Sequence, residues 1–283
     1  MRLLHLAGAI LAAMICVSSP AKAQTLVTDL TQWVGEPYKS STYLDLMALA
    51  VPSFMNDGDG YYTRQAFPLR HVSDEPDRKE TIEVGGLLGS PRVMPIETKG
   101  HKRLAMLFEL TQPTDSAERV TALALFDLDH EPKLLDFANV AYDRQTGFFD
   151  PARLTLPDGS TTLLITSGHS NSNQAYHFHA MIDLRGDRLH LIDTFFLLND
   201  NACRFERTQQ PRFAAAGSPK QPAIQVTVTE TVTRRNVDCG SDPAPQTGKR
   251  TFSVRYQWRS KTKRFIRNSD ALDRLSEEAS KHL

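Results

Sequence analysis

The sequence has few of the motifs by which enzyme classes are recognised. It contains no Gly-rich phosphate loop, no His-Glu-x-x-His pair, no Gly-x-Ser-x-Gly elbow and no Ser-x-x-Lys set with its partner motifs. Beyond the N-terminal segment it also lacks an apolar run of about 18 residues, which excludes a membrane-spanning body. The residues therefore name no reaction, and function has to be inferred from location, fold and local clusters.

Cysteine is scarce, and its three positions are Cys16, Cys203 and Cys239. No Cys-x-x-Cys pair occurs, so a thioredoxin-like redox activity is not expected, and the paired spacing of a zinc site is missing. Cys16 lies in the N-terminal apolar segment, which leaves two cysteines in the rest of the chain. In an oxidising compartment these two predict a Cys203–Cys239 disulfide, worth about 4 kcal/mol in the chain-entropy model.

The first 23 residues have the pattern of a secretory signal peptide. Arg2 precedes a mostly apolar run from Leu3 to Val17, and Ala21-Lys22-Ala23 is typical of a cleavage site. We expect a mature chain that begins at Gln24 and is periplasmic or secreted. A retained anchor is one alternative. A lipoprotein signal is another, and it is disfavoured because the large Ile15 precedes Cys16.

Neither sign of charge is in excess, because 33 Lys and Arg balance 33 Asp and Glu. Carboxylates are missing locally, however: residues 249–267 hold eight Lys and Arg and no Asp or Glu. These cations have two interpretations. They keep strand edges soluble and unpaired, or they face an anionic surface such as an acidic polymer, phospholipid head groups or a partner protein. An exported protein is not expected to bind nucleic acid.

Alternation of apolar and polar residues dominates most of the chain, as where Ile224, Val226 and Val228 alternate with polar residues. Strands are expected near residues 80–88, 92–98, 102–111, 119–128, 133–142, 153–156, 161–167, 175–184, 188–197, 222–234, 250–259 and 264–267. A short helix is expected within 40–54 behind Ser40 or Ser41, and a closing amphipathic helix after Asp270.

These elements predict a mainly β protein, either an antiparallel β-sandwich or an open propeller-like sheet system, with a short N-terminal helix and a C-terminal helix. Residues 24–40 are expected to form an extended entry segment, and residues 41–283 a single β-rich domain. A Gly186-Asp187 turn between two strand patterns predicts a hairpin whose register pairs Asp183 with His190 and Phe178 with Phe195.

Five of the nine histidines lie between His130 and His190. Strand alternation places His177, His179 and Asp183 on one face, and imidazole and carboxylate groups are ligands for zinc or copper. The two histidines lie about 6.5 Å apart along a strand and need a further ligand from another strand. Half-buried structural histidines are the favoured interpretation, and a metal site is the alternative.

The segment Ser167 to Gln174 is an unusually polar connection between two strong strands. Its His169 suggests a catalytic base, but neighbouring residues of one loop rarely face one another. A turn that bonds its own backbone is the favoured interpretation. If the segment has a function, recognition of a polar ligand by His169, Asn171 and Asn173 is easier to defend than hydrolysis.

Residues 56–60, Asn-Asp-Gly-Asp-Gly, resemble part of a calcium loop. The match is incomplete, because Met55 stands where the first carboxylate belongs and no Glu follows at the twelfth position. We expect an acidic turn here, with calcium binding as the alternative.

Two functions of different class remain. The leading hypothesis is an exported, soluble, non-catalytic binding or envelope-associated protein. The alternative is a secreted hydrolase or metal-dependent enzyme that uses the His-rich segment 169–190. An inhibitor or immunity-type partner of another secreted protein is a third possibility, which predicts an exposed apolar patch.

Overall fold

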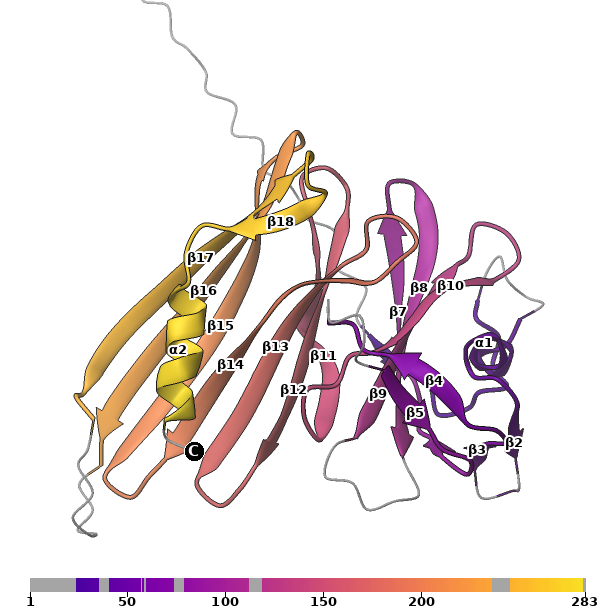
Figure 1. Cartoon of the computed structure of the whole chain (residues 1–283), viewed down its shortest axis with the longest axis horizontal. Helices are drawn as coiled ribbons and strands as arrows, with labels where there is room; N and C mark the ends of the chain where they lie inside the picture. The colour runs from indigo at the N-terminus through magenta and orange to yellow at the C-terminus, as the bar shows by residue number, and fades with distance from the viewer. Residues whose placement is uncertain are drawn as a thin grey trace, which may run out of the picture.

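The fold consists almost entirely of antiparallel β-structure. The computed structural model describes residues 24–35, 41–56, 58, 60–73, 79–111, 119–235 and 245–281. Within them lie two eight-stranded sheets, a two-stranded sheet, and one helix near each end (Figure 1). The prediction of a mainly β protein with a short N-terminal helix and a C-terminal helix is confirmed. The proposed signal peptide, residues 1–23, lies outside the described residues.

The first sheet is built around one central strand, β8, which pairs with β7 and β6 along one edge and with β9 along the other. Its strands are β1 (Thr25–Leu26), β2 (Phe54–Asn56), β3 (Tyr61–Thr63), β6 (Leu87–Leu88), β7 (Arg92–Thr98), β8 (His101–Thr111), β9 (Val120–Asp127) and β10 (Lys133–Asn139). The small sheet pairs β4 (Phe67–Arg70) with β5 (Lys79–Ile82). The expected strand 80–88 is thus two strands, because the chain turns at Gly85 with φ 82°.

Helix α1 (Tyr43–Ala50) packs on the outer face of this sheet. Its N-cap is Thr42, whose hydroxyl accepts from the Asp45 backbone N–H at 3.2 Å, while the Asp45 carboxylate accepts from the Thr42 N–H at 2.7 Å. This capping box explains why the helix begins later than the predicted Ser40 or Ser41. The helix ends at Ala50, and its C-cap, Val51, directly precedes Pro52.

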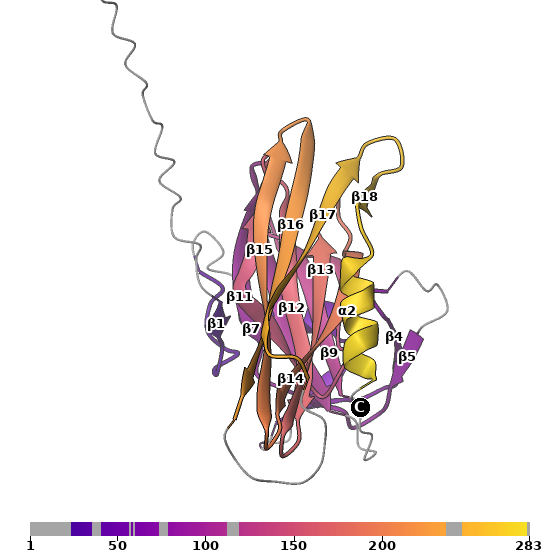
Figure 2. The same cartoon turned by 90° about the vertical axis from the view of Figure 1, so that its left-hand side faces the viewer.

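The second sheet is a meander in which each strand pairs with the next in sequence. Its strands are β11 (Gln145–Thr155), β12 (Thr161–Ser170), β13 (Gln174–Asp183), β14 (His190–Asn201), β15 (Phe205–Ser218), β16 (Gln221–Arg234), β17 (Gly248–Arg259) and β18 (Arg264–Arg267). Apolar residues of β12 and β13, including Leu163 and Ile182, pack against β8 and β9 of the first sheet. The two sheets therefore stack face to face, as the sandwich alternative expects (Figure 2).

The second sheet splits between β14 and β15. These strands pair only at Asp200↔Arg207 and Asn201↔Glu206. Beyond that point a second apolar core fills the space between β11–β14 and β15–β17. Helix α2 (Ala271–Ser280) closes the gap with buried Leu272, Leu275 and Ala279, which confirms the predicted amphipathic helix after Asp270.

Hydrogen bonds from side chains replace the missing backbone pairs along the split. The Gln209 side-chain oxygen accepts from the Leu198 N–H at 2.8 Å, and the Ser276 hydroxyl of α2 accepts from the Phe196 N–H at 3.0 Å. These bonds satisfy backbone groups that a diverging edge would otherwise leave unpaired.

The β13–β14 hairpin has the predicted register only near its turn. Asp183 pairs with His190 as expected. A β-bulge on β14, between Leu191 and Asp193, then shifts the register by one residue, so that Phe178 pairs with Phe196 and not with Phe195. No helix in the described part of the chain is long and apolar enough to cross a bilayer.

Candidate functional site

His169 lies on strand β12 and not in a loop, so the predicted polar loop is shorter than expected. Its Nδ1 lies 2.5 Å from the Asp143 carboxylate, and its ring stacks on Tyr176 with 4.5 Å between centroids. The His169 side chain is one-third exposed, whereas Asp143 is largely buried. Such a pair orients an imidazole as a base would need. Within the described residues, no hydroxyl or thiol is hydrogen-bonded to this imidazole.

The two asparagines form the turn that follows His169. The Asn171 side-chain oxygen accepts from the Gln174 N–H at 3.0 Å, and its amide donates to the Tyr176 hydroxyl at 2.9 Å. Asn173 is exposed at the tip, and its carbonyl accepts from the Asn201 N–H. This geometry supports the interpretation of a turn that bonds its own backbone.

The three predicted metal ligands do not converge. The ring centroids of His177 and His179 are 6.3 Å apart. Asp183 lies four residues beyond His179 on the same face of β13, beside Arg185. Within the described ranges, no group of three or more His, Cys, Asp or Glu side chains is placed to hold a metal ion. The structure gives the zinc hypothesis no support at these residues.

His179 is a core side chain. Its ring packs edge-on against Phe149 and lies against Phe195 and Phe213, and only 4% of the residue is exposed. Burial, with a smaller contribution from His177, lowers the pKa of His179 to about 3. The ring is therefore neutral at physiological pH, and its buried Nδ1 has no hydrogen-bond partner among the described residues.

Asp183 belongs to a buried ionic cluster that the sequence did not indicate. Its carboxylate lies 3.3 Å from Arg185 Nε, and Arg185 Nη1 lies 2.5 Å from Asp158. Arg185 also covers the ring of Trp258 at 4.1 Å. Burial raises the pKa of Asp183 to about 7, against the opposing effect of Arg185. The cluster ties two turns to strand β17, which is a structural role.

The calcium hypothesis falls on residues that are only partly described. Asp57 and Asp59 lie outside the described residues, and the Asn56 side-chain oxygen accepts from the Gly58 N–H at 2.8 Å. The Asn56 oxygen is therefore engaged in a local turn.

The basic stretch 249–267 divides into paired and unpaired cations. Arg250 contacts Glu230 and Glu278, and Arg267 contacts Asp193 and Asp273. The other six have no carboxylate within 4 Å in the described part of the chain; they are Lys249, Arg255, Arg259, Lys261, Lys263 and Arg264. Four of these lie within residues 259–264, at the turn between β17 and β18, which projects at the same end as the β15–β16 turn (Figures 1 and 2).

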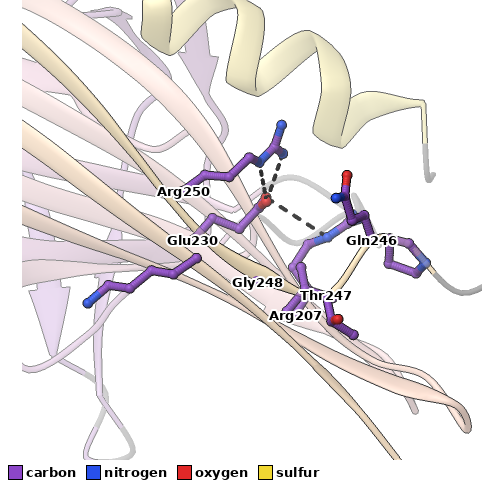
Figure 3. A pocket seen from close by; sticks show the side chains of 9 residues that line it. Arg207, Glu230, Gln246, Thr247, Gly248 and Arg250 are labelled. Carbon is purple, nitrogen blue, oxygen red and sulfur yellow. Dashed lines mark hydrogen bonds and ion pairs between the residues drawn. The ribbon is translucent and has the colours of Figure 1, made fainter.

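A cavity lies at the other end of β17, between β15, β16 and β17 (Figure 3). Its volume is about 350 Å³, and its charged lining residues are Arg207, Glu230, Lys249 and Arg250. Glu230 is 3% exposed and lies between the two guanidinium groups. A sequence signal for this site exists, because Glu230 interrupts the apolar face formed by Val226, Val228 and Val232.

No family model, no curated protein and no solved structure matches this chain.

Proposed function

We propose that this is an exported, non-catalytic binding protein that attaches to an anionic surface of the cell envelope through the β17–β18 hairpin. The observation that carries the proposal is the crowding of Arg259, Lys261, Lys263 and Arg264 into six residues with no described carboxylate within 4 Å. Each exposed cation near an anionic lipid surface contributes about 1 kcal/mol of binding free energy, so the four cations in and beside this turn together contribute about 4 kcal/mol.

Protection of strand edges does not account for the whole cluster. Lys261 and Lys263 lie in the turn itself, beyond the ends of both strands, where no backbone ladder has to be shielded. Beside them on β18, Ile266 is 46% exposed. An apolar side chain next to cations suits contact with a lipid head-group layer.

The base of the hairpin is rigidly held. Trp258 and Phe265 pair across the two strands with their rings 5.3 Å apart, edge to face, and Arg185 lies against both rings. A fixed base presents the cations in one arrangement, which lowers the entropy lost on binding.

Neutralising the turn is expected to weaken binding strongly. The Lys261→Gln/Lys263→Gln variant should bind vesicles containing anionic phospholipid about 30-fold less tightly, since two contributions of about 1 kcal/mol are lost. Vesicle sedimentation measures this affinity.

The matched control is Lys102→Gln/Lys133→Gln, which removes the same charge from exposed positions on the first sheet. It should bind like the unaltered protein. Equal weakening of both variants would show that net charge, and not the hairpin, determines binding.

A disulfide between Cys203 and Cys239 is part of the same proposal, because export places the chain in an oxidising compartment. Phe205 pairs with Arg234, and the Arg235 N–H donates to the Arg204 carbonyl at 2.7 Å, so the chain leaves β16 beside the residue that follows Cys203. Cys239, four residues further on, lies outside the described residues.

Mass spectrometry of the exported protein without reductant should give a mass about 2 Da below that of the reduced protein. Two free thiols at full titre would refute the pairing.

A further inference from the structure

Arg207 is a buried cation for which the described residues supply no hydrogen bond. Its side chain is 7% exposed, and its interactions in the described part of the chain are a contact of 4.0 Å from Nε to Glu230 and the ring of Phe205 at 5.8 Å. The buried Nε has no hydrogen-bond partner there. A buried N–H group without an acceptor is costly, and proteins normally supply one.

Glu230 is already occupied by other donors. Its carboxylate accepts from the Gln209 side-chain amide at 2.7 Å and from Arg250 Nε at 2.8 Å. These two bonds hold the carboxylate in the rung Gln209–Glu230–Arg250, which runs across three strands. Glu230 balances the charge of Arg207 at a distance but does not satisfy its N–H groups.

Arg207 borders the cavity of about 350 Å³ described above. Residues 245–248 also line it, and Figure 3 shows the labelled side chains gathered around Glu230. Three cations and one carboxylate line the space, so the cavity has a positive balance. Its volume lies at the lower end of the range for small-ligand sites.

We infer that this cavity binds the oxyanion group, a carboxylate or a phosphate, of a small molecule, and that Arg207 is its binding residue. The planar guanidinium offers parallel N–H donors that match two oxygens of such a group. Lys249 and Arg250 at the rim attract the anion toward the cavity. The site is separate from the proposed surface contact, because it lies at the Gly248 end of β17 and the cationic turn at the Arg259 end.

Calorimetric titration with inorganic phosphate and, separately, with succinate tests the inference. The unaltered protein should bind at least one of them with 1:1 saturation, and the anion that binds identifies the preferred group. Arg207→Gln should weaken this binding by about tenfold or more, as expected for a lost charge-assisted pair. Arg212→Gln, an exposed position on the same strand, is the control and should bind like the unaltered protein.

Arg207→Lys keeps the charge opposite Glu230 and loses the two-pronged donor, so it should bind several-fold more weakly while the fold is preserved. Absence of saturable binding for both anions, or unchanged affinity in the Arg207 variants, overturns the inference. The Lys261→Gln/Lys263→Gln variant should keep the small-anion site, which separates failure of this inference from failure of the surface proposal.

Discussion

Replacing Glu230 with alanine is expected to lower the free energy of unfolding by about 3–5 kcal/mol. The carboxylate is buried and accepts from Gln209 and Arg250, and it is the only carboxylate recorded near Arg207 among the described residues. Its removal leaves the buried Arg207 charge without a counter-ion and the Gln209 amide without an acceptor. Urea unfolding at neutral pH measures the change.

Glu206→Ala is the matched control, because Glu206 lies on the same strand pair, is 47% exposed and contacts Arg235 at 3.5 Å. An exposed ion pair contributes at most about 1 kcal/mol. If Glu230→Ala lowered the free energy of unfolding as little as Glu206→Ala does, the interactions of Gln209, Glu230 and Arg250 would not stabilise this end of the sheet.

His179→Phe is expected to stabilise the protein, and to do so more strongly at acidic pH. The pKa of His179 in the fold is about 3, well below the ordinary value of 6.5. Below pH 6.5 the unfolded chain therefore takes up a proton that the native ring does not, and native stability falls as the pH drops toward 3. Phenylalanine has no such proton and also removes the unbonded Nδ1.

The free energy of unfolding of the variant should therefore exceed that of the original protein by a margin that is about 2 kcal/mol larger at about pH 5 than at about pH 7.5. One pKa unit corresponds to about 1.4 kcal/mol. Urea unfolding of both proteins at both pH values gives this difference. A change in packing energy that is the same at both pH values cancels in this difference. Asp183 is common to both proteins, so its own titration cancels as well: its raised pKa contributes stability at low pH that is lost as the pH rises toward 7.

A stability difference independent of pH would contradict this account. It would mean that His179 is protonated in the fold as easily as in the unfolded chain. That behaviour would favour the alternative of an enzyme that uses the His-rich segment 169–190.

Sequence reasoning located most strands because alternation reflects one buried face, and it missed strands that show no alternation of their own. Strand β15 is the clearest case. Its segments Gln209-Gln210-Pro211-Arg212 and Ala214-Ala215-Ala216 show no apolar alternation, yet it pairs with β16 along its whole length. The neighbouring strand, and not its own pattern, determines its conformation.

The same limit applies to register and to sites. The Gly186-Asp187 turn predicted the hairpin register correctly up to the bulge on β14. No local sequence pattern indicated that bulge. His169 was identified as a candidate, but its partner Asp143 lies 26 residues earlier and reaches it only through sheet pairing. Glu230 could have been found, because a carboxylate on an otherwise apolar strand face needs partners.

The most direct test of the central claim is binding of the protein to anionic and to zwitterionic vesicles, at about 50 mM and about 500 mM salt. We predict binding to the anionic vesicles at low salt, release at high salt, and negligible binding to zwitterionic vesicles. Equal binding to both vesicle types, or no binding to either, would contradict the claim that the β17–β18 hairpin attaches this protein to an anionic surface.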